Sequence, residues 1–201
     1  MSDTTLVGGS YKRVFRKGLW PYMKRDSLVL ELGPCKGAWS RAILNCLAKG
    51  ELHTVDLQDT TQWLQPDKYQ GRLVCHTITK NADFAFLPDS YFDVAWSFGV
   101  LCHNNASSIA EILAHSLPKI KPGGHAIHQY ADWEKLERYG WKAGGVPPEF
   151  RSMADDEIWW PRNSQATMAD LARSAGWIVI TADLDLLRRD SIILLRRPVA
   201  K

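Results

Sequence analysis

Cysteine is scarce in this chain of 201 residues, and it follows no pattern typical of a disulfide framework or a metal site. There is no C-x-x-C pair, and the cysteines are widely separated in the sequence. We therefore expect reduced thiols and a cytoplasmic protein. The cysteines are Cys35, Cys46, Cys75 and Cys102.

Long hydrophobic runs are also missing. No stretch approaches the roughly 18 consecutive apolar residues of a membrane span, and residues 1–18 have no apolar core of the signal-peptide kind. These absences exclude an integral membrane protein and argue against export. The net charge of +3 is too small to indicate a nucleic-acid partner.

What is present is the composition of an ordinary globular domain. The chain is 45% hydrophobic and 23% charged, which is enough to build a sizeable core. We find no repeat, low-complexity tract or linker. We therefore expect a single domain over residues 1–201, and the oligomeric state is left open.

Strand-like and helix-like segments alternate along the chain, which favours a parallel sheet covered by helices on both faces. Asn105 is suited to begin one of the helices, and Gly176 to end another. The expected helices are 37–49, 60–65, 105–119 and 164–175. The expected strands are 28–32, 51–57, 72–78, 92–97, 124–129, 177–183 and 190–196.

The most informative stretch is 28–37, LVLELGPCKG, in which an apolar strand carries Glu31 and breaks into a glycine turn before a helix. Gly33 and Gly37 allow close backbone approach, and the helix start offers unpaired N–H groups to a ligand. A second strand ends in Asp56, 25 residues after Glu31. An acid at this place can bind the two ribose hydroxyls of an adenosine cofactor.

More segments follow in order: Asp83-Phe84 before Leu87-Pro88, Phe92-Asp93-Val94, Val100-Leu101-Cys102-His103, and Lys121-Pro122-Gly123-Gly124. Together with the glycine turn and Asp56, they resemble the class I S-adenosylmethionine-dependent methyltransferases in order and spacing. The resemblance is strong over residues 26–131. It departs from the family at Cys35, which replaces the middle glycine of the first motif.

The resemblance implies an α/β, Rossmann-like three-layer sandwich with a seven-stranded, mostly parallel sheet and an antiparallel last strand. It also implies S-adenosylmethionine as the cofactor. Tyr11 or Lys12 is expected to close over the methionine carboxylate. The residues implied to bind the cofactor are Glu31, Gly33, Pro34, Gly37, Asp56, Leu57, Asp83, Phe84 and Ser97.

Residues 131–163, which we name the insertion, interrupt the alternation of strands and helices with glycine, proline and four tryptophans. Long irregular segments in compact domains are usually functional, and the family commonly builds its acceptor pocket here. Tryptophan faces suit sugar or aromatic rings, although large apolar anchors are also needed to fold such a segment. We expect a small-molecule acceptor, such as a sugar or glycoside, and no nucleic-acid or membrane partner. The expected acceptor-binding residues are Tyr130, Asp132, Trp133, Trp159, Trp160 and Arg162.

Methyl transfer to a hydroxyl requires removal of its proton, and histidine is suited to this near neutral pH. His103 follows the fourth expected strand, at the edge where open α/β sheets bind ligands. Family members often carry histidine here without using it, so a purely structural role stays open. His128 is the second candidate base, with Asp132 or Tyr130 as orienting groups.

Several alternatives remain. The acceptor atom could be nitrogen. A nicotinamide-dependent oxidoreductase would show G-x-G-x-x-G, which residues 33–37 lack. A non-catalytic cofactor-binding protein would need a damaged site, whereas only Cys35 departs from the pattern. Asp155-Asp156-Glu157 favours a solvated loop over a metal site, although a magnesium requirement stays open.

Overall fold

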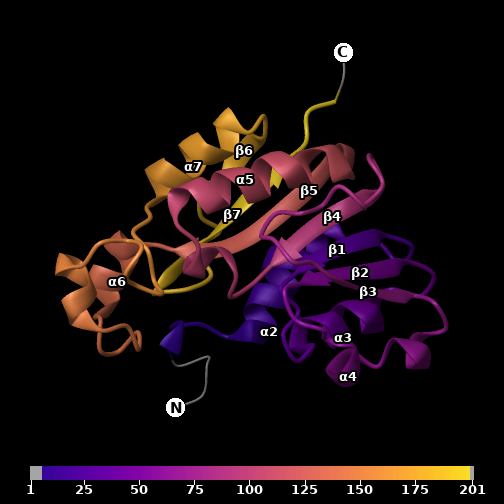
Figure 1. Ribbon diagram of the computed structural model, residues 1–201, viewed down its shortest axis with the longest axis horizontal. Helices are drawn as coiled ribbons and strands as arrows, with labels where there is room; N and C mark the ends of the chain where they lie inside the picture. The colour runs from indigo at the N-terminus through magenta and orange to yellow at the C-terminus, as the bar shows by residue number, and fades with distance from the viewer. Residues whose placement is uncertain (1–5, 200–201) are drawn as a thin grey trace.

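The structure is a computed structural model that describes residues 6–199, and it is built on one sheet of seven strands (Figure 1). The strand order is β3-β2-β1-β4-β5-β7-β6. The strands are β1 (Leu28–Leu32), β2 (Glu51–Asp56), β3 (Leu73–Thr77), β4 (Phe92–Ser97), β5 (Ile120–Ala131), β6 (Ile178–Thr181) and β7 (Asp190–Arg196).

The predicted fold class is confirmed. Strands β1 to β5 pair in parallel, and β7 runs antiparallel between β5 and β6. The order reverses direction at β1 and β4, so the chain leaves β1 toward one side of the sheet and later crosses back to the other. In such sheets the crevice outside the strand ends at the reversal is the usual ligand site.

Helices cover both faces of the sheet, with α2, α3 and α4 on one side and α5 and α7 on the other (Figure 1). Each face has its own apolar core, because the central strands are buried on both sides. The α-helices are α2 (Tyr11–Val14), α3 (Ala38–Cys46), α4 (Thr61–Leu64), α5 (Ala106–Ser116), α6 (Trp133–Tyr139) and α7 (Gln165–Ser174). Shorter turns are η1 (Phe15–Leu19), η2 (Trp20–Tyr22), η3 (Pro66–Tyr69), η4 (Leu101–His103), η5 (Leu117–Lys119) and η6 (Pro148–Ser152).

Helix ends follow the predicted signals. The Asn105 side chain accepts a hydrogen bond from the Ser108 N–H at 3.0 Å and begins α5. Gly176 has a φ of 93° and follows the end of α7, as expected of a C-terminal cap. Residue Trp177 then donates from Nε1 to the Leu113 carbonyl at 2.9 Å, which joins the end of α7 to α5.

The structure corrects three expectations. The predicted turn 121–124 lies within β5, which begins at Ile120 and carries a register irregularity against β4. Residues 11–22 are helical, although no helix was predicted there. The insertion is not wholly irregular, because the Asp132 side chain accepts from the Lys135 N–H and begins the short helix α6. The short length of these helices hid their periodicity in the sequence.

No helix within residues 6–199 combines the length and hydrophobicity needed to cross a membrane.

The cap of α5 gives a direct test of the fold. Replacement of Asn105 by alanine removes the acceptor for the Ser108 N–H, and it should lower the free energy of unfolding by about 1 kcal/mol. Asn105→Asp keeps an acceptor at this place and should stay close to the wild type. Urea denaturation of both variants measures the difference, and equal stability of the alanine variant would contradict the cap.

Candidate functional site

A cavity of about 490 Å³ opens at the carboxyl ends of β1, β2 and β4. Its wall comes from the segments that follow these strands, so residues distant in sequence meet at one edge of the sheet. Sequence reasoning placed Gly33, Asp56, Leu57, Phe84 and His103 in the site, and all of them line this cavity. The remaining lining residues are Leu32, Cys35, Val55, Gln58, Ile78, Asn81, Gly99, Val100, Asn104 and Ile112.

The glycine turn is tightly built against its neighbours. Gly33 has a φ of +64°, and a Cβ at this position would lie 2.3 Å from the Val100 side chain. Gly37 has a φ of +78° at the start of α3, and its Cβ would lie 2.3 Å from Leu64. Cys35 itself takes a φ of 52°, the conformation that glycine favours. Cys35, which stands at the place of the family's middle glycine, therefore adopts a backbone conformation open to glycine. Pro34, also predicted to bind the cofactor, is buried and does not line the cavity.

Glu31 does not line the cavity but lies beneath the turn, 1% exposed. Its Oε2 accepts a hydrogen bond from the Ser40 hydroxyl of α3 at 2.5 Å. Burial raises the pKa of Glu31 to about 7, against the lowering effects of the Ser40 hydrogen bond and of Arg41; Asp56 raises it slightly further. The hydrogen bond between Ser40 and Glu31 therefore joins β1 to α3.

Asp56 ends β2 at the cavity wall. Its Oδ1 accepts from the backbone N–H of Gln58 at 3.0 Å, which holds the carboxylate in place. Its Oδ2 accepts no hydrogen bond from residues 6–199. An oriented carboxylate with one free oxygen at the end of β2 is suited to bind hydroxyl groups. Leu57 beside it is 58% exposed at the mouth.

Asp83 was predicted to bind the cofactor, but it lies outside the cavity. Asp83 lines an adjoining hollow of about 600 Å³ between residues 80–85 and α5, and it does not reach the cavity. Its neighbour Phe84 does line the cavity, together with Asn81. The Asn81 Nδ2 donates to the Asn104 Oδ1 at 2.7 Å. Sequence reasoning missed this amide pair, because 23 residues separate its members.

His103 is exposed at the cavity wall, at the end of the turn after β4. Its Nδ1 lies 2.8 Å from the carbonyl oxygen of Trp159, in the insertion. A carbonyl only accepts hydrogen bonds, so Nδ1 carries the hydrogen, and in the neutral ring Nε2 is the unprotonated nitrogen. The insertion thus fixes the tautomer of this histidine.

His128 is corrected as a candidate base. It is 0% exposed between neighbouring strands, where its Nδ1 lies 2.8 Å from the Ser97 hydroxyl. Burial lowers the pKa of His128 to about 4, so the ring is neutral at physiological pH. Its Nε2 has no hydrogen-bond partner in the described chain and faces the core. Ser97, predicted to bind the cofactor, is likewise fully buried.

Two predicted acceptor-binding residues belong to the scaffold. Tyr130 is 0% exposed, and its hydroxyl donates to the Ala182 carbonyl at 2.8 Å. Burial raises the pKa of Tyr130, with further raising by the Asp132 carboxylate. Asp132 is also 0% exposed and accepts from the Ser191 hydroxyl at 2.6 Å. Neither side chain lines the cavity, because both are enclosed by the surrounding core.

The tryptophans of the insertion mostly form its own apolar core, which includes Trp141 and Trp160. Arg162 lies over the Trp133 ring at 4.7 Å and bonds the Asp155 carboxylate and three backbone carbonyls of the insertion. Trp133, Trp160 and Arg162 were predicted to bind the acceptor, but they hold the insertion together.

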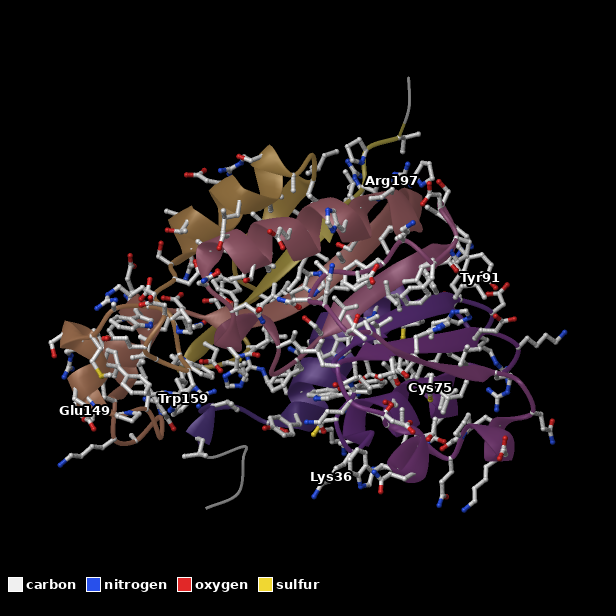
Figure 2. All side chains as sticks on the ribbon, in the orientation of Figure 1. Lys36, Cys75, Tyr91, Glu149, Trp159 and Arg197 are labelled. Atoms are coloured by element: carbon white, nitrogen blue, oxygen red, sulfur yellow. The ribbon has the colours of Figure 1, made fainter. Side chains whose placement is uncertain are left out.

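Trp159 differs from these residues, because it is 48% exposed. Its ring centroid lies 6.0 Å from that of His103. Figure 2 shows Trp159 and Glu149 on the insertion, at the end of the molecule remote from Cys75 and Tyr91. Trp159 is therefore the predicted acceptor-binding residue that the structure leaves available beside the cavity.

Within residues 6–199, no group of three or more histidine, cysteine or acidic side chains is arranged to hold a metal ion. In the acidic run of the insertion, Asp155 pairs with Arg162 at 2.6 Å. The Glu157 carboxylate accepts from the Ala154 N–H at 3.3 Å. These contacts support the interpretation of the run as a loop.

Comparison with known proteins identifies a family whose model matches most of the chain. Residues 10–182 match the family model described as a methyltransferase domain. No curated protein matches the chain.

Solved structures share the fold at low sequence identity. The 1,6-didemethyltoxoflavin-N1-methyltransferase of Burkholderia thailandensis, with bound 1,6-didemethyltoxoflavin and S-adenosylhomocysteine, is 13% identical with a TM-score of 0.65, over 98% of this chain and 80% of that one. The geranyl diphosphate C-methyltransferase of Streptomyces coelicolor A3(2) was solved in complex with Mg2+, geranyl-S-thiolodiphosphate and S-adenosyl-L-homocysteine. It is 9% identical with a TM-score of 0.66, and the match covers 92% of this chain and 75% of that one. A possible exported protein of Bordetella parapertussis is 15% identical with a TM-score of 0.63, and the match covers 92% of this chain and 66% of that one.

The buried carboxyl of Glu31 predicts a stability that depends on pH. The ordinary pKa of 4.5 rises to about 7 in the folded chain, so this group's contribution is full below pH 4.5 and is lost as the pH rises through 7. Relative to Glu31→Gln, which stays neutral, the wild type should therefore lose up to roughly 3 kcal/mol between about pH 4.5 and pH 8.

Denaturant unfolding at both pH values measures this difference. Glu149→Gln, at an exposed position, is the control and should follow the wild type (Figure 2). A constant difference between wild type and Glu31→Gln would show that the pKa of the Glu31 carboxyl is not raised in the folded chain.

Proposed function

This chain belongs to the methyltransferase-domain family, and from that premise we propose that it transfers a methyl group from S-adenosylmethionine to a hydroxyl oxygen of a small molecule. The observation that carries the proposal is the setting of His103. It lies on the cavity wall with Nδ1 bound to the Trp159 carbonyl, so Nε2 is left as the basic nitrogen.

The cavity is suited to the cofactor. Gly33 presents backbone where a side chain would collide with Val100, so a ligand can approach the turn closely. Asp56 offers a free carboxylate oxygen at the end of β2, the place of a ribose-binding acid. Phe84 and Ile112 add apolar surface to the cavity lining, which suits a flat base.

The bound cofactor supplies an electrophilic methyl group together with its own leaving group. The protein then has to align the acceptor and accept its proton. As the new oxygen–carbon bond forms, the hydroxyl proton passes to Nε2 of His103, while the Trp159 carbonyl stabilises the resulting imidazolium through Nδ1–H. Because that carbonyl belongs to the insertion, acceptor binding and base orientation depend on the same segment.

The acceptor is proposed to bind between the cavity and the insertion, residues 131–163. The exposed face of Trp159 is suited to pack against a pyranose or an aromatic ring beside His103. A hydroxylated ring, such as a sugar, glycoside or phenol, combines that flat surface with the group to be methylated. The internal contacts of Trp160 and Arg162 give no further support for a carbohydrate in particular.

Asp56 tests the cofactor assignment. Asp56→Ala removes the free carboxylate oxygen, and it should weaken S-adenosylhomocysteine binding by roughly 1–3 kcal/mol, or about 5- to 150-fold, in isothermal titration. Asp59→Ala is the control, since Asp59 bonds Thr61 and does not line the cavity. Equal affinity of Asp56→Ala and wild type would refute the ribose role.

His103 tests the chemistry. His103→Ala should lower kcat by about 10²- to 10⁴-fold, the usual value of general-base help, with unchanged affinity for S-adenosylhomocysteine. His103→Gln keeps a donor for the Trp159 carbonyl but has no basic nitrogen, so it should be equally slow. Recovery of activity in the glutamine variant would mean that His103 only anchors the insertion.

The assay needs the acceptor. Sugars, glycosides and phenolic metabolites, with primary amines in parallel, are to be screened for methyl uptake from labelled S-adenosylmethionine. Methylation of amines alone would overturn the assignment of an oxygen acceptor while leaving the enzyme class intact.

A further inference from the structure

Two charged residues are buried at the start of β7, outside the cavity. Arg189 is 8% exposed and Asp190 is 0% exposed. The guanidinium forks onto the carboxylate, with Nε to Oδ1 at 2.8 Å and Nη2 to Oδ2 at 2.7 Å. Removing two charges from water costs several kcal/mol per ion, and a well-packed apolar pair is often at least as stable. A contribution to stability alone therefore gives a weak reason for this pair.

One side of the pair reaches the cavity wall. The Asp190 Oδ2 also accepts from the Gln129 Nε2 at 2.8 Å. The Gln129 Oε1 in turn accepts from the Gly99 N–H at 2.8 Å. Gly99 lines the cavity with a φ of +76°, four residues before His103. The segment that carries the proposed base is thus held at its beginning by a glutamine whose own orientation depends on Asp190.

The other side of the pair reaches the insertion. The Arg189 Nη1 donates to the Gly144 carbonyl at 2.8 Å, and the guanidinium lies over the Trp160 ring at 4.4 Å. Trp160 packs against His103, with ring centroids 5.2 Å apart, and against Trp159 at 5.6 Å. Successive contacts lead from Gly99 through Gln129, Asp190, Arg189 and Trp160 to His103, and the chain from 99 to 103 joins the two ends.

Cys102 of the turn η4 is buried near the same charged pair, Arg189 and Asp190. The Cys102 thiol is 1% exposed, one residue before His103. Burial raises the pKa of Cys102; the Asp190 carboxylate raises it further, while Arg189 and a hydrogen bond with Gln129 lower it. The Cys102 side chain therefore lies close to all three residues.

We propose that Gln129, Asp190 and Arg189 are positioning residues that couple the cofactor cavity to the acceptor-binding insertion. In this arrangement the insertion and the Gly99–His103 segment order together, so a change on the insertion side alters cofactor affinity. The inference rests on the proposed function, because it assigns the cavity to the cofactor and the insertion to the acceptor.

The test is a change at Arg189, which does not line the cavity, measured at the cavity. Arg189→Met should weaken S-adenosylhomocysteine binding roughly 3- to 10-fold in isothermal titration. Arg151→Met is the matched control: Arg151 also lies over a tryptophan of the insertion, Trp141, at 4.6 Å, and its exposed side chain pairs with Glu137 inside the insertion. It should stay within about 2-fold of the wild type.

Amide hydrogen exchange separates a local change at Gly99 from general destabilisation, which would speed exchange in the core strands as well. In Arg189→Met, exchange at the Gly99 amide should speed up, while the amides of β4 stay protected. Gln129→Met removes the acceptor for the Gly99 N–H directly and should give the same pattern. If Arg189→Met does not fold, Arg189→Lys keeps the buried charge but loses the fork and the planar stacking, and it should change both readouts in the same direction.

Folded Arg189 variants with unchanged Gly99 exchange and unchanged S-adenosylhomocysteine affinity would overturn the coupling. An equal loss of affinity in Arg151→Met would also overturn it, since the effect would then not depend on the contacts of Arg189. Failure of the wild type to bind S-adenosylhomocysteine would instead refute the proposed function, so the two failures are distinguishable.

Discussion

Parallel pairing of β1 with both β2 and β4 is the constraint on which the site depends. Because the three strands point the same way, their carboxyl ends meet at one edge, and the turns that follow them surround a single cavity. Gly33, Asp56 and His103 are far apart in the sequence, but Gly33 follows β1, Asp56 ends β2 and His103 lies in the turn after β4. The buried cores on both faces of the sheet fix the strand ends, and contacts between the turns, such as Asn81 with Asn104, complete the edge.

The insertion is a second structural unit added to that edge. It has an apolar core of its own, and polar contacts tie it to the sheet at few places. Two of these matter for function: the His103 ring with the Trp159 carbonyl, and Arg189 with the Gly144 carbonyl. Most residues that the sequence suggested as acceptor ligands hold this segment folded, whereas Trp159 is exposed.

Much of the fold could be predicted because its signals are local. Apolar runs bounded by glycine and polar residues marked the strands, and Asn105 and Gly176 marked helix ends. The short helices of residues 11–22 and 133–139 were missed, since one or two turns show too little periodicity. Asp83 was predicted from the family pattern alone, whereas it is Asn81 of the loop after β3 that lines the cavity.

The sequence by itself determined which segments form the strands, where the glycine turn lies and which acid ends β2. Each of these features depends on neighbouring residues and on backbone geometry. Only the tertiary structure decided which polar side chains face the cavity. His128 and Tyr130 stand on a strand that is buried on both faces, so their chemistry is enclosed. His103 meets Trp159 across 56 residues of chain, and Gln129 meets Asp190 across 61. Such contacts arise from the packing of whole elements, which no local pattern records.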